Sequence, residues 1–439
     1  MINHDSKELF GKFSTVPLFV LVVLAGAVIS LLRILVTNPA ALSELVWAED
    51  GLFPLCINSY GYFSCLVDPF AGYLLFLSRT LALPVSFFPL SNWPLVTNLV
   101  AAIAIGLGSA FITWLLIRAN VSRGAAVIAG LIPVSIPIVG FEAVNSSGSA
   151  YMIMLIIAAI LVSFRFSPLL PLWVTPIFLL GCSLTIPSSA VLAIPLAFFL
   201  LAEKANRRRH LVNLFFLGIG LLVQFLVVIT AENSRPIAIT FDSLTQWVSQ
   251  IPVAIATLAP AITRLSDAGL IESDLVSPNS LWGAGILVVL VLAVVFLNVK
   301  GNRMQAAAGW LIFIGFLMGL IPALAGYSNN RYFVVPLAVL LIGILVIADS
   351  LIHKRNAIVF TLVGVLLAIL WLPAFGASNF RSQARPDWEP MLKGVVEGCE
   401  TNSSGTGAIV FSPEWPFSDA IFLGPTSNII DCAQLLGTG

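Results

Sequence analysis

Long apolar runs, repeated along almost the whole chain, are the feature that most limits how this sequence can fold. A helix needs about 20 apolar residues to cross the hydrocarbon core of a bilayer, and the first such run extends from about Val16 to Thr37. Only 10% of the residues are charged, whereas a soluble domain carries about 25%. The sequence therefore predicts an all-α polytopic membrane protein. The first run is too long for a signal peptide and lacks a small-residue cleavage site, which favours a retained first helix.

The same pattern predicts about eleven membrane-spanning helices. The fifth and sixth runs are short, and the Ile186-Pro187 break between them predicts either a turn or a kink. The runs lie near 16–37, 93–117, 124–141, 149–164, 169–183, 187–202, 210–230, 282–299, 305–326, 333–350 and 356–376.

Basic residues set the predicted orientation, because cytoplasmic turns are enriched in Lys and Arg. With the N-terminus inside, the short inner turns collect most of the basic residues, and Arg207-Arg208-Arg209 is the strongest cluster. This predicts a multi-pass membrane protein with a cytoplasmic N-terminus and a C-terminus on the outer side. The formal net charge is zero, so no basic surface argues for nucleic acid.

Three outer segments are long enough to carry function or structure of their own. They are a first loop at 38–92, a second loop at 231–281 and a tail at 377–439, which divides the chain into a transmembrane domain, 1–376, and a small α/β cap. The Ala408–Phe411 run predicts a buried strand in this cap. The inner turns are too short for a nucleotide site, and no Walker-type, HExxH or CxxC motif occurs.

Four of the five cysteines lie in these outer segments. Cys56 and Cys65 are in the first loop, Cys399 and Cys432 are in the tail, and Cys182 is inside a predicted helix. In an oxidising compartment the first four are candidates for two local disulfides. Free cysteines in apolar surroundings are the alternative.

An acidic pair in the first outer loop is the main candidate for chemistry. Glu49 and Asp50 follow the first apolar run, and acids close to a bilayer are costly and usually functional. The segment from Ala71 to Pro89 is apolar but broken by Arg79, which predicts helices in the membrane interface instead of a clean span. Such a loop would hold the two acids over a cavity between the helices. Interfacial anchoring and helix-start charge are the alternative roles for this segment.

Other outer residues could contact a ligand. An arginine at a helix start can bind a phosphate or carboxylate through two hydrogen bonds, and Arg331 occupies such a position; an anchor that snorkels to the interface is the alternative. Glu142, in the turn after the third run, is either a further ligand contact or a solvated turn residue. The remaining candidates for sugar or lipid contact are Trp47, Tyr73, Asn330 and Tyr332.

The Glu49-Asp50 motif, the Pro69–Tyr73 segment followed by Arg79, and the late Arg331-Tyr332-Phe333 with Pro336 carry a resemblance to a known family. At these residues the chain resembles bacterial GT-C glycosyltransferases, which take a sugar from a polyprenyl-phosphate donor. In size and layout it is similar to the glucosyltransferases that decorate O-antigen. The resemblance implies a protein of the bacterial inner membrane with a periplasmic C-terminus.

The resemblance implies Asp50 as the general base, with Glu49 as second choice or acceptor ligand. It implies that Arg331 binds the donor phosphate, with Arg79 as a helper. The partners would be the donor, a glycan or lipid-linked acceptor and membrane lipids. No cofactor is expected, because the family's lipid-monophosphosugar enzymes generally need no metal and the three histidines are predicted on the inner side; a divalent ion on the paired acids is a less favoured alternative.

The alternatives to a glycosyltransferase are a transporter or flippase and an O-antigen polymerase or ligase. A transporter or flippase would place charges within spans, whereas Arg33 lies near the outer end of its run and Gln224 is an isolated polar residue at mid-run. An O-antigen polymerase or ligase usually has arginine-rich outer loops, whereas these loops are acid-rich. A purely structural protein would leave Glu49 and Asp50 without a role.

Overall fold

The structure is a computed structural model, and it describes most of the chain. The described residues are 16–37, 40–46, 48–70, 72–136, 145–146, 151–164, 170–230, 303–324, 334–351, 356–371, 388–401, 405–409 and 429–432.

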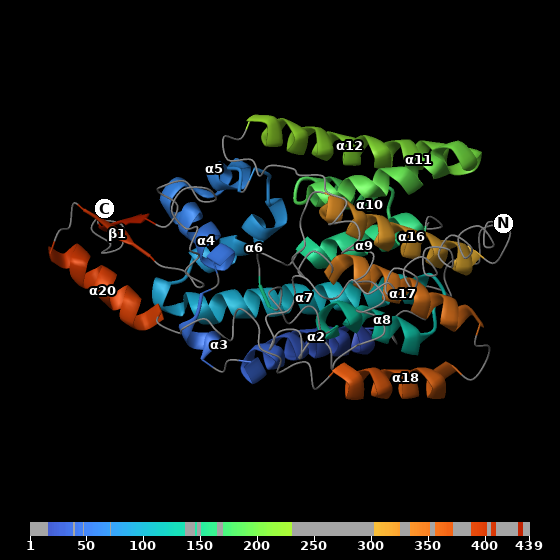
Figure 1. The fold of residues 1–439 in the computed structure, drawn as a ribbon, viewed down its shortest axis with the longest axis horizontal. Helices are drawn as coiled ribbons and strands as arrows, with labels where there is room; N and C mark the ends of the chain where they lie inside the picture. Colours follow the sequence, from blue (N-terminus) through green and yellow to red (C-terminus); the bar gives the residue numbers. More distant parts are fainter. Residues whose placement is uncertain are drawn as a thin grey trace, which may run out of the picture.

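Long apolar helices lie side by side and form a bundle (Figure 1). Among the described residues, four helices are long and apolar enough to cross a membrane. These are α2 (Val16–Thr37), α7 (Trp93–Arg118), α12 (Arg207–Thr230) and α17 (Val334–Leu351). The chain is therefore a helical membrane protein.

Further apolar helices complete the bundle. They are α8 (Arg123–Ser135), α9 (Tyr151–Ser163), α10 (Val174–Ser183), the short helix η4 (Pro187–Leu192) continued by α11 (Ala193–Ala202), α16 (Arg303–Leu324) and α18 (Asn356–Trp371). A polar turn of helix, η5 (Lys204–Asn206), joins α11 to α12. Each predicted apolar run coincides with at least one helix of this bundle, except the run 282–299, which lies outside the described residues.

The prediction of about eleven full spans is wrong for the residues that the structure describes. Several runs form helices well short of the expected length: α8 ends soon after Pro133, and the run near 187–202 is divided between η4 and α11. Most residues of α9 are buried against neighbouring helices. A helix that is apolar all round is as typical of a protein interior as of a lipid-facing span, so hydropathy alone overestimates the number of spans.

Close contact between α2 and α7 depends on small residues. A Cβ atom added at Gly106 of α7 would collide with the backbone oxygen of Val23 on α2, and one at Gly26 would lie 3.1 Å from the Cα of Gly106. Small residues let helix backbones approach within a membrane, where dispersion and interhelical hydrogen bonds drive association. This contact sets the position of α2 beside α7 and, through it, the place of the polar residues described below.

One end of the bundle carries the short helices and the cap. At the left of Figure 1 lie α3 (Ala41–Glu44), α4 (Ala48–Tyr60), α5 (Tyr62–Val67), α6 (Phe76–Ser86) and η2 (Leu90–Asn92), together with α20 (Trp388–Thr401), β1 (Thr406–Ala408) and β2 (Ile429–Asp431). We call this the loop end. The 71–89 segment thus contains a short helix and no long span, as its broken pattern predicted.

The cap is attached to the loop end through a pair of tryptophans. The Trp388 ring of α20 stacks on Trp93 with centroids 6.4 Å apart, and its Nε1 donates a hydrogen bond to the Leu90 oxygen over 2.9 Å. The two strands pair antiparallel with Gly407 opposite Ile430, and Ile409 is buried directly after β1. The predicted strand thus begins earlier in the chain; residues 410–411 lie outside the described part.

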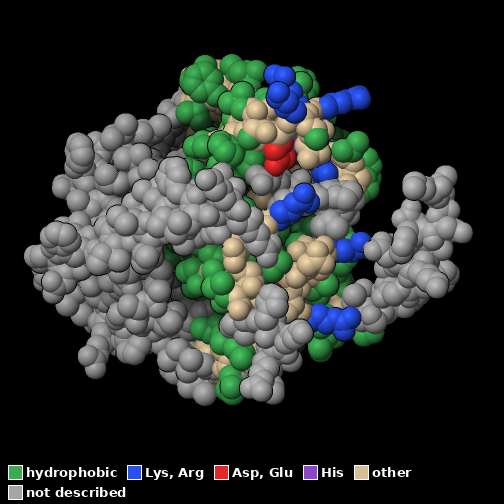
Figure 2. All heavy atoms as spheres, turned by 90° about the vertical axis from the view of Figure 1, so that its right-hand side faces the viewer, with side chains coloured by type: hydrophobic (Ala, Val, Ile, Leu, Met, Phe, Trp, Pro, Cys, Tyr) green, Lys and Arg blue, Asp and Glu red, His purple; other side chains and the backbone are tan. Residues whose placement is uncertain are grey.

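The opposite end of the bundle is rich in basic side chains. Figure 2 shows this face with Lys and Arg side chains spread across it and few acids among the described residues. Helices begin or end with arginines at 118, 123, 207–209 and 303. We call this the basic end, and its charge is opposite in sign to the acid-rich loops of the other end.

The structure joins the outer cysteines in two pairs. Cys56 is bonded to Cys65, linking α4 to α5, and Cys399 is bonded to Cys432, linking α20 to the residue after β2. Cys182 is a buried free thiol in α10. Both disulfides are at the loop end.

Thiol counting tests this arrangement. We expect the denatured, unreduced protein to take up one equivalent of N-ethylmaleimide, at Cys182, and the reduced protein to take up five, because two disulfides protect four of the five cysteines. Intact mass spectrometry of protein purified with the thiols blocked at lysis measures both numbers. Three or five adducts without reductant would contradict the pairing.

Candidate functional site

Asp50 lies at the loop end, in the first turn of α4. Its side chain is only 3% exposed, and its Oδ1 accepts a hydrogen bond from Ser146 Oγ over 3.0 Å. Carboxylates in the first turn of a helix are stabilised by the partial positive charge of that helix end. The structure therefore holds this carboxylate inside the protein with a hydroxyl donor against it. Glu49 lies in the same turn of α4, and its side chain is outside the described part.

A buried amide network holds the Ser146 segment in place. The Asn145 Nδ2 donates to the backbone oxygen of Asn98 over 3.0 Å and to Asn98 Oδ1 over 2.8 Å, while Ser30 Oγ donates to Asn145 Oδ1 over 2.9 Å. Asn145 has φ of 51°, a left-handed conformation that asparagine adopts more readily than most residues. The network ties α2 and α7 to the residue that precedes the partner of Asp50.

Arg33 supports the same region from α2. Its Nη1 donates to the Val134 oxygen over 2.8 Å and to the Ile136 oxygen over 2.9 Å. The last carbonyl groups of a helix have no partner within the helix, so this guanidinium satisfies the end of α8. Arg33 is buried, and its role is to join α2 to α8.

Arg79 lies in α6 and is also buried, at 2% exposure. Its Nη2 is 3.5 Å from an Asp68 carboxylate oxygen, and its guanidinium carbon is 5.2 Å from the centre of the Phe53 ring. Burial lowers the pKa of Arg79, and the charge of Asp68 partly offsets that change. Among the described residues, its Nε and Nη1 atoms have no hydrogen-bond partner. A buried arginine with donors to spare is suited to an anionic ligand.

Phe53 relates the position of Asp50 in α4 to that of Arg79 in α6. Asp50 and Phe53 are three residues apart in α4, and residues at that spacing lie on the same side of a helix. Arg79 of α6 lies over the Phe53 ring, so a buried guanidinium meets α4 one turn after the buried Asp50 carboxylate. We take these two buried residues, Asp50 and Arg79, as the candidate site, while the ion-pair partner of Arg79 is Asp68.

The turn that leads to α6 is fixed from both sides. The backbones of Phe70 and Tyr73 exchange two hydrogen bonds around Gly72, whose φ of 85° favours glycine. Phe70 packs edge-on against Phe53 with centroids 5.5 Å apart. Tyr73 is therefore hydrogen-bonded to a residue that packs on Phe53, and its role as a sugar or lipid contact stays a prediction.

Gln224 of α12 holds the next residue of this turn. Its Oε1 accepts from the Leu74 nitrogen over 2.9 Å and its Nε2 donates to the Leu74 oxygen over 3.0 Å. Thr185 Oγ1 accepts from the nitrogen of Leu77, in the first turn of α6, over 3.2 Å. The two side chains supply partners to backbone groups of the loop that the bundle would otherwise leave unsatisfied.

The other predicted ligand contacts lie outside the described residues. These are Trp47, Glu142, Asn330, Arg331 and Tyr332. The structure thus buries both Asp50 and Arg79 at the loop end, and it describes neither Arg331 nor the Glu49 side chain. Arg33, Gln224, Asn145 and Ser146 support the site, and their roles were not predicted; an isolated polar residue in an apolar run was the signal for the first two.

A metal site is not evident in this region. Among the residues that the structure describes, no group of three or more His, Cys, Asp or Glu side chains is placed to hold a metal ion.

Compared with known proteins, the sequence matches no family model and no curated protein.

The two hydrogen bonds between the Gln224 amide and the backbone of Leu74 predict a loss of stability when the amide is removed. Gln224→Leu leaves the buried nitrogen and oxygen of Leu74 without partners, at a cost of roughly 1–3 kcal/mol for each unsatisfied group. We expect a lower thermal midpoint in detergent, measured by tryptophan fluorescence. Phe225→Leu is the matched control, because Phe225 is the next residue of α12 and is 59% exposed. Equal thermal midpoints for the two variants would show that the hydrogen bonds between Gln224 and Leu74 do not stabilise the fold.

The Asn145 network predicts a large effect from an almost isosteric change. Asn145→Asp replaces the Nδ2 donor with an oxygen that faces two Asn98 oxygens, which removes two hydrogen bonds and destabilises the protein by about 2 kcal/mol or more. Asn92→Asp, at an exposed helix start, is the control and should be neutral. Chemical denaturation in detergent measures both variants; a neutral Asn145→Asp would show that the network does not stabilise the fold.

Proposed function

We propose that this chain is an integral membrane glycosyltransferase that transfers a sugar from a polyprenyl-phosphate donor to a cell-surface glycan such as O-antigen. The proposal is supported by two buried charged groups at the loop end: the Asp50 carboxylate, and the Arg79 guanidinium, which has N–H donors without partners among the described residues. A base and a cation for a leaving phosphate are the two groups that this transfer requires. The sugar donated is proposed to be a hexose, with glucose as the first choice.

The proposed reaction needs one proton acceptor and one positive charge. The acceptor hydroxyl gives its proton to Asp50 while its oxygen forms a bond to the anomeric carbon. The bond from that carbon to the phosphate oxygen breaks, and polyprenyl phosphate leaves with the electron pair. Arg79 compensates the charge that develops on the phosphate. Glu49 remains the second choice for the base, and Arg331 remains a further candidate for the phosphate.

Burial of Asp50 gives the mechanism a conformational step. With 3% of the residue exposed, the acceptor can reach the carboxylate only after part of the loop end moves. Segments that close over an active site commonly exclude water and complete the site. The Ser146 hydroxyl would be displaced by the acceptor hydroxyl at the same carboxylate oxygen.

The proposed orientation follows the positive-inside rule. The basic end faces the cytoplasm, and the loop end with its two disulfides faces the periplasm, where cysteines are oxidised.

Two polar residues favour an enzyme over a transporter. Arg33 and Gln224 lie within apolar helices, where a transporter would place its substrate contacts. Both side chains instead bind backbone groups of neighbouring segments. Their polarity is thereby explained without a transported substrate.

Asp50→Asn is the decisive variant. Its side-chain oxygen can still accept from Ser146, so we expect normal folding and a loss of transfer by roughly 10²- to 10⁴-fold, as for removal of a general base. The assay supplies membranes with radiolabelled polyprenyl-phosphate glucose, with and without EDTA, and measures label in lipid-linked and polymeric glycan. We expect EDTA to leave transfer unchanged.

Controls separate the base from nearby acids. Glu44→Gln removes an exposed carboxylate in α3 and should leave transfer at the wild-type level, and Glu49→Gln tests the second choice. Full activity of Asp50→Asn would refute the base assignment, and full activity of both Asp50→Asn and Glu49→Gln would refute the carboxylate mechanism.

Two substitutions of Arg79 test its proposed role at the phosphate. Arg79→Met removes the charge and should abolish transfer, whereas Arg79→Lys should retain part of it. Asp68→Asn removes the ion-pair partner, whose side chain is 60% exposed, and should have little effect because exposed pairs contribute little. If Asp68→Asn lost as much activity as Arg79→Met, the arginine would act through its ion pair and not on the donor.

A further inference from the structure

A second, separate cleft lies at the basic end, between the start of α12 and the start of α10. It has a volume of about 1090 Å³, within the size range of small-molecule sites. The residues that line it include Arg208, Arg209, Val212 and Phe216 of α12, Trp173, which precedes α10, and Ile177 of α10. It lies at the opposite end of the bundle from Asp50 and Arg79.

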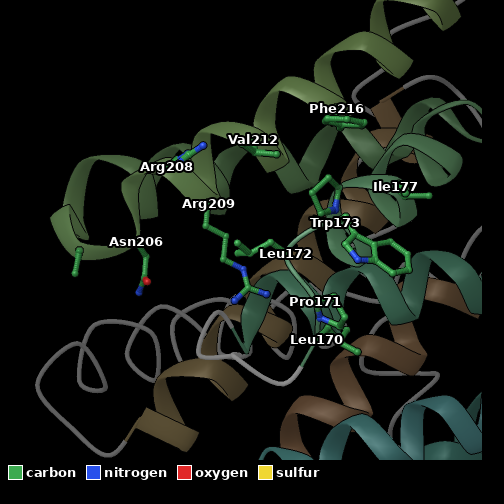
Figure 3. A pocket seen from close by; sticks show the side chains of 12 residues that line it. Leu170, Pro171, Leu172, Trp173, Ile177, Asn206, Arg208, Arg209, Val212 and Phe216 are labelled. Carbon is green, nitrogen blue, oxygen red and sulfur yellow. The ribbon is translucent and has the colours of Figure 1, made fainter.

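The lining is divided into a cationic part and an apolar part. Figure 3 shows the Arg209 side chain reaching from α12 across the cleft towards Leu172, with Arg208 and Asn206 at the same end. Trp173, Ile177 and Phe216 lie at the other end of the same view. A ligand that fills the cleft thus meets positive charge at one end and apolar surface at the other.

The apolar part continues onto a surface that nothing in the described protein covers. Beyond the cleft, α12 exposes Phe215, Ile219 and Leu222, and next to it Trp173 and Ile177 are more than half exposed. In a membrane-spanning helix, such surface faces lipid chains. Aromatic residues close to arginines at the end of a membrane-spanning helix are typical of the membrane–water interface.

We propose that this cleft binds an anionic phospholipid of the cytoplasmic leaflet. The phosphate would lie against Arg209 and Arg208 through charge-assisted hydrogen bonds, the glycerol region would contact Trp173, and the acyl chains would follow Val212 and Phe216 along α12. Charge complementarity favours an anionic headgroup, and the apolar wall favours a lipid over a soluble phosphate. The inference rests on the positive-inside orientation and is independent of the glycosyltransferase proposal.

Binding is tested by native mass spectrometry of the full-length protein in detergent. Dioleoyl phosphatidylglycerol and dioleoyl phosphatidylcholine, which differ only in the headgroup, are added at equal concentration, and the ratio of bound lipids is measured. We expect the wild type to prefer phosphatidylglycerol, and the Arg208→Gln/Arg209→Gln variant to lose roughly 10-fold or more of that preference, given about 1 kcal/mol per basic residue near a lipid surface.

Arg207→Gln is the matched control. It removes one positive charge from the same helix turn, but Arg207 does not line the cleft, so the preference should be kept. A second measurement uses phosphatidylglycerol brominated on its chains, which should quench wild-type fluorescence more than that of Trp173→Phe.

Three results would overturn the proposal. One is equal binding of the two lipids to the wild type. Another is a loss of preference in Arg207→Gln as large as in the double variant, which would indicate a diffuse charge effect. The last is displacement of phosphatidylglycerol by an equimolar polyprenyl phosphate, which would make the cleft a carrier-lipid site.

Discussion

Polar groups within a bilayer must find their partners inside the protein, and this constraint explains the most informative contacts of the structure. Water is absent from the hydrocarbon region, so an unsatisfied backbone nitrogen or oxygen is costly there. Gln224 satisfies both backbone groups of Leu74, and Arg33 satisfies two carbonyls where α8 ends. In each case one polar side chain in an apolar helix serves the backbone of another segment.

The candidate site inherits its geometry from these contacts. Asn145 fixes the residue whose hydroxyl meets Asp50, and Gln224 with Thr185 fixes the turn that delivers Arg79. Asp50 belongs to α4 and Arg79 to α6, and Arg79 lies over the ring of Phe53, which follows Asp50 by three residues. Their relative position therefore depends on helices α2, α7 and α12, which contribute no reactive group themselves.

Some of this arrangement could be predicted from the sequence, and the physical reasons differ from residue to residue. Apolar runs located the helices because burial and lipid exposure both demand apolar surface, and for the same reason they overestimated the number of full spans at α8 and α9. The Arg79 break identified a short helix in the first loop. The pairing of Gln224 with Leu74, 150 residues apart, could not be predicted, because a single amide gives no sign of which distant backbone it will meet.

The stacking of Trp388 on Trp93 has a consequence for the order of events during synthesis. The Trp388 indole is bonded to a backbone oxygen 298 residues earlier in the chain, beside helices that carry Asp50 and Arg79. The loop end can acquire this contact only after the residues between Leu90 and Trp388 have been synthesised and α20 has docked on η2. A nascent chain would therefore hold Asp50 and Arg79 in incomplete surroundings until synthesis is nearly finished, which makes completion of the loop end a late step of folding.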